Sequence, residues 1–317
     1  MFLDRGRIWY IPPSGYSHEA GVSHLRWEYL PEPDGEAGFQ SSGRAKVSSG
    51  TRSRVAAAYE DDPLKLAPTN PSVPLWRPPP EPLTLGSDEV HVWRAALNRA
   101  ASQVQSLQRT LTADEQARAE RFYFQKDRER FVVGRGLLRI ILGRYLNLEP
   151  NQLRFDYSPY GKPSLAPEID GGGLRFNVSH SHELALYAVT RGREIGIDVE
   201  RLRPDFASEQ IAERFFSPRE VAELRALPPE VQTEAFFNCW TRKEAYIKAI
   251  GEGLSHPLDQ FDVSLVPGQP ASLLSTRTNP SEAARWSLLA LIPSPDYVAA
   301  LAVEGHGWRL VRWQCWE

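Results

Sequence analysis

The chain has 317 residues, of which 41% are hydrophobic and 24% charged, the composition of an ordinary soluble globular protein long enough for two domains. Its formal net charge of −3 gives no basic field that would attract nucleic acid, and no run of about eighteen apolar residues predicts a membrane span. The first residues carry no signal-peptide core and the two cysteines form no metal-ligand or disulfide pattern, so we expect a cytoplasmic protein that binds neither nucleic acid nor membrane.

Residues 1–82 differ in composition from the rest of the chain. They hold 12 of the 26 prolines, together with Ser/Gly/Arg-rich runs such as residues 48–53, and such segments cannot sustain regular helices or central strands. Aromatic residues such as Trp9, Trp27 and Trp76 argue against a purely solvated tail. We therefore predict a largely irregular extension, whose role stays open.

Regular structure is predicted from Leu83 onward. Thr112 and Glu115 form a capping box that marks a helix start, and three glycines at residues 171–173 predict a turn. Hydrophobic periodicity predicts helices over residues 95–107 and 128–145 and strands over residues 90–93, 153–157, 174–178 and 185–190.

The order of these elements is repeated later in the chain. Residues 119–123 (Ala-Glu-Arg-Phe-Tyr) are echoed by residues 212–216 (Ala-Glu-Arg-Phe-Phe). Each copy precedes a long amphipathic helix and then a strand that opens with Phe-Asp. We interpret this as an internal duplication, with an N-terminal half at residues 83–193 and a C-terminal half at residues 194–317. Two such α+β halves would leave a cleft between them for a ligand.

Two segments in the first half carry polar side chains of interest. Residues 176–182 (Phe-Asn-Val-Ser-His-Ser-His) contain two histidines, but no further ligand lies at zinc spacing, and the serine is not on a Gly-x-Ser-x-Gly elbow. At a strand end, Ser179 and His180 can instead hydrogen-bond a phosphate. Lys162 and Pro163 follow a Tyr-Gly turn, where an ordinary surface lysine is equally well supported.

The segment Gly196-Ile-Asp-Val-Glu200 opens the second half. In an extended strand, alternate side chains point to one face, so Asp198 and Glu200 project together while Ile197 and Val199 pack behind them. An isolated Asp-x-Glu is most often a pair of solvated acids, and its position near the seam between the halves is what favours a site.

The segment Trp240-Thr-Arg-Lys-Glu-Ala-Tyr-Ile-Lys248 places Glu244 and Lys248 one helical turn apart. Its apolar residues indicate a helix that packs against a core, although such a pair is most often a surface contact. If the helix over residues 240–248 approaches the strand over residues 196–200, three acids and a lysine converge. This predicts a site where a hard cation binds a phosphate group.

Together, residues 176–181, 196–200 and 240–248 resemble the motifs of 4′-phosphopantetheinyl transferases of the surfactin-synthetase-activator type. The resemblance covers roughly residues 83–305 and implies that family's fold, two pseudo-symmetric α+β halves in a monomer. It also implies transfer of the 4′-phosphopantetheine arm of coenzyme A to a serine of an acyl or peptidyl carrier protein, with release of 3′,5′-ADP. The cofactor would be Mg2+, with Mn2+ as an alternative.

The resemblance also assigns roles to residues. Glu115 departs from the family, because some members have a phosphate-binding lysine near this position that Arg118 would have to replace, and Glu252 likewise stands where relatives often have lysine. By position, Asp198, Glu200 and Glu244 match the metal-binding acids, Lys248 a lysine at the coenzyme A phosphates, and Arg130, Lys162, Pro163, Ser179 and His180 the coenzyme A contacts.

The chemistry of these residue types agrees with the assignment. Magnesium held by the acids would polarise the pyrophosphate, and Lys248 would stabilise charge on the leaving group. Glu244, or a water that it orients, is the candidate base, so Asp198, Glu244 and Lys248 are the expected catalytic residues. Two alternatives stay open, namely another magnesium-dependent phosphotransferase and a non-catalytic module that binds carrier proteins.

Overall fold

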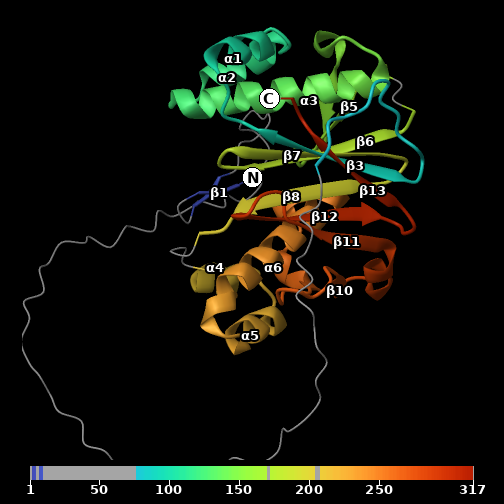
Figure 1. Cartoon of the computed structure of the whole chain (residues 1–317). Coiled ribbons are helices and arrows are strands. Elements are labelled where there is room, and N and C mark those ends of the chain that lie inside the picture. The colour runs from blue at the N-terminus through green and yellow to red at the C-terminus, as the bar shows by residue number, and fades with distance from the viewer. Residues whose placement is uncertain (1, 5–6, 10–75, 170–171, 204–207, 317) are drawn as a thin grey trace, which may run out of the picture. The chain divides into compact units, whose positions relative to one another are not determined.

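The computed structural model describes residues 2–4, 7–9, 76–169, 172–203 and 208–316 (Figure 1). Most of the extension predicted at residues 1–82 lies outside the described residues. The described part of it includes two short antiparallel strands, β1 (Phe2–Asp4) and β2 (Arg7–Trp9). Among the helices of the described ranges, none is long and apolar enough to cross a membrane.

The first half is built from a sheet and three helices that cover one of its faces (Figure 1). Its elements are β3 (Glu89–Ala96), α1 (Ala101–Gln108), α2 (Ala113–Glu120), α3 (Gln125–Leu146), the 3-10 helix η1 (Pro150–Gln152), β4 (Phe155–Tyr157), β5 (Pro163–Leu165), β6 (Leu174–Ser181) and β7 (Leu184–Arg191).

The helix that was expected over residues 95–107 begins at Ala101 instead. Ala95 and Ala96 continue strand β3, where they pair with Ala185 and Leu184 of β7. Alanine has the highest intrinsic helix propensity, but that preference amounts to less than about 1 kcal/mol per residue, and burial within a sheet outweighs it here.

The helix boundaries follow from local signals. The capping box is confirmed, because the N–H of Thr112 donates to Glu115 Oε2 at 3.0 Å at the start of α2. Helix α3 has 22 residues and ends at Asn147, whose φ of 52° is left-handed. Its counterpart α6 also has 22 residues and ends at Gly251, with a φ of 81°. Such left-handed residues satisfy the last carbonyls of a helix and stop it.

The second half repeats this plan with its own sheet and long helix. Its elements are β8 (Ile195–Arg201), α4 (Ser208–Phe215), α5 (Pro218–Ala226), α6 (Pro229–Ile250), the 3-10 helices η2 (Gly253–Ser255) and η3 (Leu258–Gln260), β9 (Phe261–Val263), β10 (Leu273–Thr276), the 3-10 helix η4 (Pro280–Arg285), β11 (Trp286–Leu291), β12 (Tyr297–Glu304) and β13 (Arg309–Gln314).

The strand order confirms the internal duplication. The second sheet runs β8-β12-β11, and the first contains β3-β7-β6, so corresponding strands occupy corresponding places. Pairing within each of these three-strand units is antiparallel. The predicted α+β class with two pseudo-symmetric halves is therefore confirmed.

Four layers result, with α1–α3 on the outer face of the first sheet and α6 on the outer face of the second (Figure 1). The inner faces of the two sheets pack against each other through a buried aliphatic core that includes Val90, Val92, Ile197 and Val199. The seam between the halves is thus a hydrophobic contact, and strand β8 lies in it.

Strand β13 departs from the predicted halves. Residues 309–314 were expected in the second half, but they pair in parallel with β3 and form the edge of the first sheet. Cys315 just beyond this strand is buried in the first-half core. The boundary at residues 193/194 falls between β7 and β8, and β13 crosses back over it.

Candidate active site

The two acids of β8 lie on one face of the strand, as alternation predicts. Asp198 and Glu200 are only 3% and 2% exposed, and Ile197 and Val199 point the other way into the core between the sheets. The acids face helix α6, because the neighbouring strand residue Ala300 packs in the core formed by that helix. They are therefore not the solvated pair that an isolated Asp-x-Glu suggests.

Helix α6 reaches this face through close contact with Gly196. A Cβ atom at Gly196 would lie 2.0 Å from the carbonyl oxygen of Ala245 and 2.4 Å from the amide nitrogen of Ala249. Both contacts are with helix backbone, which cannot move aside as a side chain can. The glycine that opens Gly-Ile-Asp-Val-Glu is thus what lets α6 lie directly against β8.

This contact brings Lys248 onto Asp198. Lys248 Nζ lies 2.6 Å from Asp198 Oδ1 and donates to Ser179 Oγ at 3.1 Å. Burial alone would lower the pKa of Lys248, but the charges of Asp198 and Glu244 outweigh burial and raise that pKa. The lysine is therefore held protonated beside the acids.

Glu244 is buried next to the same pair. Burial, followed by repulsion from Asp198, raises the pKa of Glu244 from its ordinary 4.5 to about 7. Glu244 Oε1 and Asp198 Oδ2 are both buried, and neither has a hydrogen-bond partner within the described residues. Two unpartnered carboxylate oxygens in one buried site are costly unless a cation or donor completes them.

Strand β6 supports the acids through its alternate polar side chains. Ser179 Oγ donates to Asp198 Oδ1 at 2.8 Å, and Ser181 Oγ donates to Glu200 Oε2 at the same distance. The predicted phosphate contact Ser179 therefore belongs to the acid network. Ser181 was missed, although its i, i+2 spacing from Ser179 repeats that of the two acids.

The same side chains also complete the unpaired edge of β8. The N–H groups of Ile197, Val199 and Arg201 donate to Asn177 Oδ1, Ser179 Oγ and Ser181 Oγ at 2.9, 3.3 and 3.2 Å. A row of edge amides is thus satisfied by side chains instead of a neighbouring backbone. Each serine hydroxyl bridges one amide and one carboxylate of β8, which links the two sheets at the acids.

The remaining predicted contacts lie around this centre. His180 is exposed and alternates away from Ser179, on the side of β6 whose Phe176 packs with the α3 core. Lys162 Nζ bonds Glu194 Oε2 and the carbonyl of Ala249, both at 2.7 Å, so it neutralises the C-terminal end of α6. Pro163 begins β5 directly after it.

Arg130 lies on the first turns of α3, with Nη2 3.7 Å from Glu183 Oε1. It borders a cavity of about 650 Å³ that is lined by residues 97–99 and by the start of α3. The acids of β8 do not line this cavity. The structure thus brings Asp198, Glu200, Glu244, Lys248 and Ser179 together and places Arg130 and Lys162 outside that cluster.

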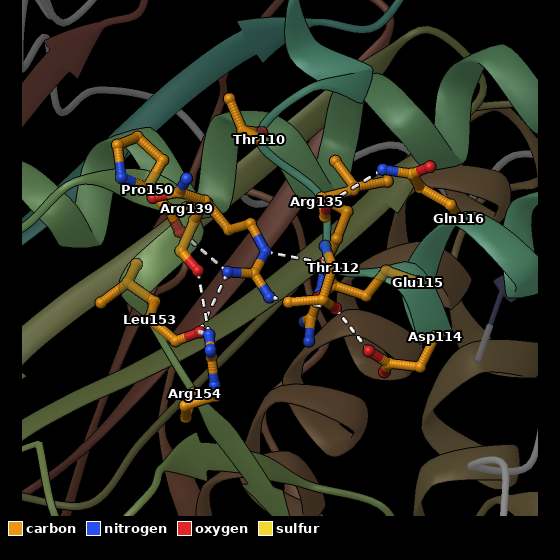
Figure 2. Close-up of polar contacts among 12 residues, drawn as sticks. Thr110, Thr112, Asp114, Glu115, Gln116, Arg135, Arg139, Pro150, Leu153 and Arg154 are labelled. Carbon is orange, nitrogen blue, oxygen red and sulfur yellow. Dashed lines mark hydrogen bonds and ion pairs between the residues drawn. The ribbon is translucent and has the colours of Figure 1, made fainter.

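Glu115, the departure from the expected lysine, has a structural role (Figure 2). It is buried between Arg135 and Arg139, and Arg139 Nε donates to Glu115 Oε2 at 2.7 Å. Burial would raise the pKa of Glu115, but the two arginines outweigh it and lower that pKa. Arg139 also donates to the carbonyl of Pro150 at 2.8 Å, so the cluster ties α2 to α3 and to the segment after it.

The donor set fits a hard cation only in part. Oxygen ligands from carboxylates are what Mg2+ prefers, and the unpartnered oxygens of Asp198 and Glu244 provide two. No group of three or more acid, histidine or cysteine side chains in the described ranges is already arranged to hold a metal ion. Glu200, bonded to Ser181, would have to join the other two acids when a cation binds.

The rest of the Trp240–Lys248 segment is structural. Lys243 is fully buried, with Nζ 2.8 Å from Glu220 Oε2, and it donates to the carbonyls of Leu258 and Phe261. Arg242 donates to the carbonyl of Ser264 at 2.6 Å. Residues 242 and 243 therefore fix the outer side of α6, while residues 244 and 248, one turn apart, face β8.

Two family models match adjoining segments of the chain. Residues 93–191 match the model described as "4′-phosphopantetheinyl transferase, N-terminal", and residues 194–302 match "4′-phosphopantetheinyl transferase superfamily". The junction between the two matches coincides with the loop between β7 and β8.

Individual proteins show the same likeness. The 4′-phosphopantetheinyl transferase HetI of Nostoc sp. is 51% identical over 238 residues, which cover 75% of this chain and 97% of that protein. The 4′-phosphopantetheinyl transferase Sfp of Bacillus subtilis is 37% identical over 49% of this chain and 66% of its own length. Among solved structures, an ACPS–CoA complex from Chronobacterium ammoniagenes is 19% identical, with a TM-score of 0.28 over 37% of this chain and 99% of that chain.

Proposed function

The chain belongs to the 4′-phosphopantetheinyl transferase superfamily, and from this premise we propose that Asp198, Glu244 and Lys248 form its catalytic centre. The enzyme transfers the 4′-phosphopantetheine moiety of coenzyme A to a serine of a carrier protein and releases 3′,5′-ADP. The observation that carries the proposal is the buried contact of Lys248 with Asp198 beside the unpartnered oxygens of Asp198 and Glu244.

The acids are the proposed cation ligands. Asp198 and Glu244 would each supply one free oxygen, and Glu200 is the third candidate ligand. When bound there, Mg2+ or Mn2+ would neutralise the pyrophosphate of coenzyme A and make its phosphorus more electrophilic. The hydroxyls of Ser179 and Ser181 hold Asp198 and Glu200 in orientation for this role.

The proton of the attacking serine needs an acceptor. The carrier serine oxygen forms a bond to the β-phosphorus while the bond to the leaving 3′,5′-ADP breaks, and Glu244 takes the serine proton directly or through a water. Burial raises the pKa of Glu244 to about 7 in the cation-free protein, and a cation bound beside it would lower that pKa and keep the carboxylate ionised, ready to accept a proton. Lys248 keeps a fixed positive charge next to the phosphate oxygens that gain charge.

Coenzyme A contacts are proposed at Arg130, Lys162, Pro163, Ser179, His180 and Lys248. Arg130 supplies a cation at the start of α3, and Lys162, which precedes Pro163 at the start of β5, donates to a carbonyl at the C-terminal end of α6. One chain holds both β6 and the strand that it supports, which favours action as a monomer. We place the enzyme in the cytoplasm, where acyl and peptidyl carrier proteins are its proposed partners.

The experiment combines the purified protein with coenzyme A, Mg2+ and a panel of apo-carrier proteins, and reads the intact carrier mass. A gain of one phosphopantetheine group supports the function. No gain with any carrier would favour another magnesium-dependent phosphotransferase, and binding without a mass gain would favour a non-catalytic carrier-binding module. Removal of divalent cations with a chelator should stop the reaction, and Mg2+ or Mn2+ should restore it.

Variants test the assigned residues. Asp198→Ala, Glu200→Ala and Glu244→Gln should each lower turnover at least about a hundredfold while the protein stays folded, and Lys248→Ala should do the same. Glu230→Gln is the matched control, because this exposed glutamate lies on the first turn of the same helix. Wild-type turnover in any one of the acid variants would remove that acid from the centre.

A further inference from the structure

The end of the N-terminal extension adds to the edge of the first sheet. Arg77 pairs in parallel with Trp313 of β13. Its N–H donates to the carbonyl of Arg312 at 3.3 Å, and its carbonyl accepts the N–H of Gln314 at 2.7 Å. This register places Trp76 next to Arg312 on the same face of the sheet. That face is the inner one, because Trp76 packs against the aliphatic core between the two sheets.

A second arginine reaches the same place from β3. Gln314 is two residues after Arg312 and shares its face, and Arg94 Nε donates to Gln314 Oε1 at 2.8 Å. The guanidinium carbon of Arg94 lies 5.0 Å from the centroid of the Trp76 ring. Arg94 Nη1 also donates to the carbonyl of Pro293, in the loop after β11 of the second sheet. Two arginines and one indole ring therefore share this part of the inner face.

Neither arginine has an acidic partner. Among the described residues, Arg94 and Arg312 form no ion pair, and burial lowers the pKa of both guanidinium groups with no carboxylate to oppose it. The core beside them on the inner face is aliphatic and includes Val90, Val92 and Leu310. Two like charges in a half-buried apolar setting destabilise the fold unless an anion neutralises them.

Two N–H groups at this place also lack an acceptor. Arg312 Nε and Trp76 Nε1 are both buried, and neither has a hydrogen-bond partner within the described ranges. Buried donors are nearly always paired, so an unpaired donor indicates a place for an ion or a water. A water molecule could accept these hydrogen bonds but would leave both positive charges unneutralised, whereas one anion would satisfy the donors and the charges together.

We propose that Arg94, Arg312 and the indole N–H of Trp76 bind a phosphate group, either inorganic phosphate or a phosphate monoester. The forked guanidinium group matches phosphate oxygens, and donors from three adjacent strands suit a tetrahedral anion better than a planar carboxylate. The site is separate from the catalytic centre, because β13 and β6 lie at opposite edges of the first sheet. Both arginines are partly exposed, so the anion has access from solvent.

A bound phosphate would join segments that are far apart in the sequence. Trp76 belongs to the extension, Arg94 to the first half, and Arg312 to the last strand of the chain. Arg94 also contacts the second sheet through Pro293. The anion would therefore stabilise the β13 edge, and phosphate should raise the unfolding temperature relative to chloride at the same ionic strength.

The test titrates inorganic phosphate into the full-length protein in chloride buffer at constant ionic strength. NMR of the labelled indole N–H groups identifies the site, because the signal that Trp76→Phe removes should shift with phosphate. Calorimetric titration gives the affinity, which Arg312→Gln should weaken roughly ten- to hundredfold and Trp76→Phe several-fold. Arg109→Gln is the matched control, since it makes the same change in charge at an exposed arginine of the first half and should bind phosphate as the wild type does.

Stability gives an independent measurement. Without phosphate, Arg312→Gln should unfold at the wild-type temperature or above it, because the change removes a half-buried unpaired charge. Phosphate should raise the unfolding temperature of the wild type and of Arg109→Gln but not that of Arg312→Gln. Lower stability of Arg312→Gln without phosphate would contradict the proposal, by showing that a group of the chain already neutralises this arginine.

Three further outcomes would overturn the assignment. The first is an unmoved Trp76 signal, or equal phosphate affinity in the wild type and Arg312→Gln. The second is a phosphate response that disappears in Lys248→Ala, which would place the anion in the catalytic centre. The third is phosphate binding that arises only in Glu60→Gln/Asp61→Asn/Asp62→Asn, because the carboxylates of the extension would then occupy the site in the native chain.

Discussion

The two halves share one topology but differ in what fills the space between sheet and helix. In the first half, Trp93 of β3 is fully buried under α3 and donates through Nε1 to Tyr145 Oη at 2.8 Å. In the second half, the strand face under α6 carries Gly196 and the two acids, and the helix backbone touches the strand at the glycine. A bulky aromatic residue separates helix and strand in one half, whereas a glycine lets them meet in the other.

This difference explains why the candidate site lies in the second half of the duplicated fold. Helix contact at Gly196 presses Glu244 and Lys248 onto Asp198 and excludes water from the acids. In the first half, the buried charged cluster is Glu115 with Arg135 and Arg139, in which the acid is fully partnered. The second half also has a buried structural pair, Lys243 with Glu220, but in addition it leaves oxygens of Asp198 and Glu244 without a partner among the described residues.

Gly196→Ala should have the largest combined effect on stability and turnover, because it acts at the contact between α6 and β8. The added methyl group would collide with helix backbone, so we expect a loss of about 1–3 kcal/mol or more in the free energy of unfolding. Because α6 must move away from the acids, turnover should fall at least about a hundredfold. Denaturant unfolding and the carrier-mass assay measure the two effects.

The matched control is Gly134→Ala in α3 of the first half. A Cβ there would make only ordinary contact, 3.7 Å from the Leu97 side chain, and alanine favours a helix over glycine by about 1 kcal/mol. Full activity in Gly196→Ala would mean that close approach of the helix is not what forms the site.

Glu115→Ala should separate structural from catalytic charges. It leaves Arg139 buried without its carboxylate, so the free energy of unfolding should fall by about 3–5 kcal/mol. Turnover per folded molecule should stay near wild type. Glu120→Ala, an exposed change on the same helix, should stay within about 0.5 kcal/mol of wild type. A stable Glu115→Ala protein with lost turnover would place chemistry in the first half too.

The pH dependence of the free energy of unfolding should reveal the raised pKa of Glu244. Its pKa in the folded protein, about 7, lies above the ordinary 4.5, so between these pH values the folded state keeps a proton that the unfolded chain has lost. Its contribution to the free energy of unfolding therefore falls as the pH rises from about 4.5 to 7, by an amount on the order of 3 kcal/mol. Glu244→Gln should abolish this fall in urea unfolding without divalent cations.

The same pH series with Glu230→Gln should match wild type, because that residue is exposed on the same helix. An unaltered pH profile in Glu244→Gln would show that Glu244 ionises normally in the folded protein.

Ser181→Ala should give the smallest effect. It removes the donor to Glu200 and the acceptor for the Arg201 N–H, which should cost about 1–3 kcal/mol of unfolding free energy. Loss of orientation at Glu200 should lower turnover several-fold, and Ser181→Thr should restore part of it. Ser164→Ala, at the exposed position of β5, should change neither quantity. Equal activity of Ser181→Ala and wild type would make the link between the sheets purely structural.

Short-range sequence patterns predicted much of the site. Alternation placed Asp198 and Glu200 on one face, and the i, i+4 spacing placed Glu244 and Lys248 on one side of a helix, because both depend only on local backbone geometry. The repeated order of elements predicted the paired halves, because a duplicated sequence folds into a duplicated unit.

What could not be predicted depends on partners far apart in the chain. Nothing near Lys162 indicates that its charge is taken up by Glu194 and the end of α6. Likewise, the sequence showed Glu115 only as a departure from a phosphate-binding lysine. Its structural role was not visible because its partners Arg135 and Arg139 lie 20 and 24 residues away from it. The exposure of Tyr123, at 91%, could not be predicted either, because Phe216 at the same place in the second copy of the motif is buried.

The edge strand β13 has a consequence for how the polypeptide folds during synthesis. Its Gln314 bonds Arg94 of β3 from 220 residues further along the chain. A ribosome therefore releases the first half long before the strand that completes its sheet, and the exposed edge of β3 stays available to the wrong partners meanwhile. The first half therefore lacks one strand of its own sheet, so splitting the gene at residues 193/194 should yield two pieces that recover a native first sheet only when they are made together.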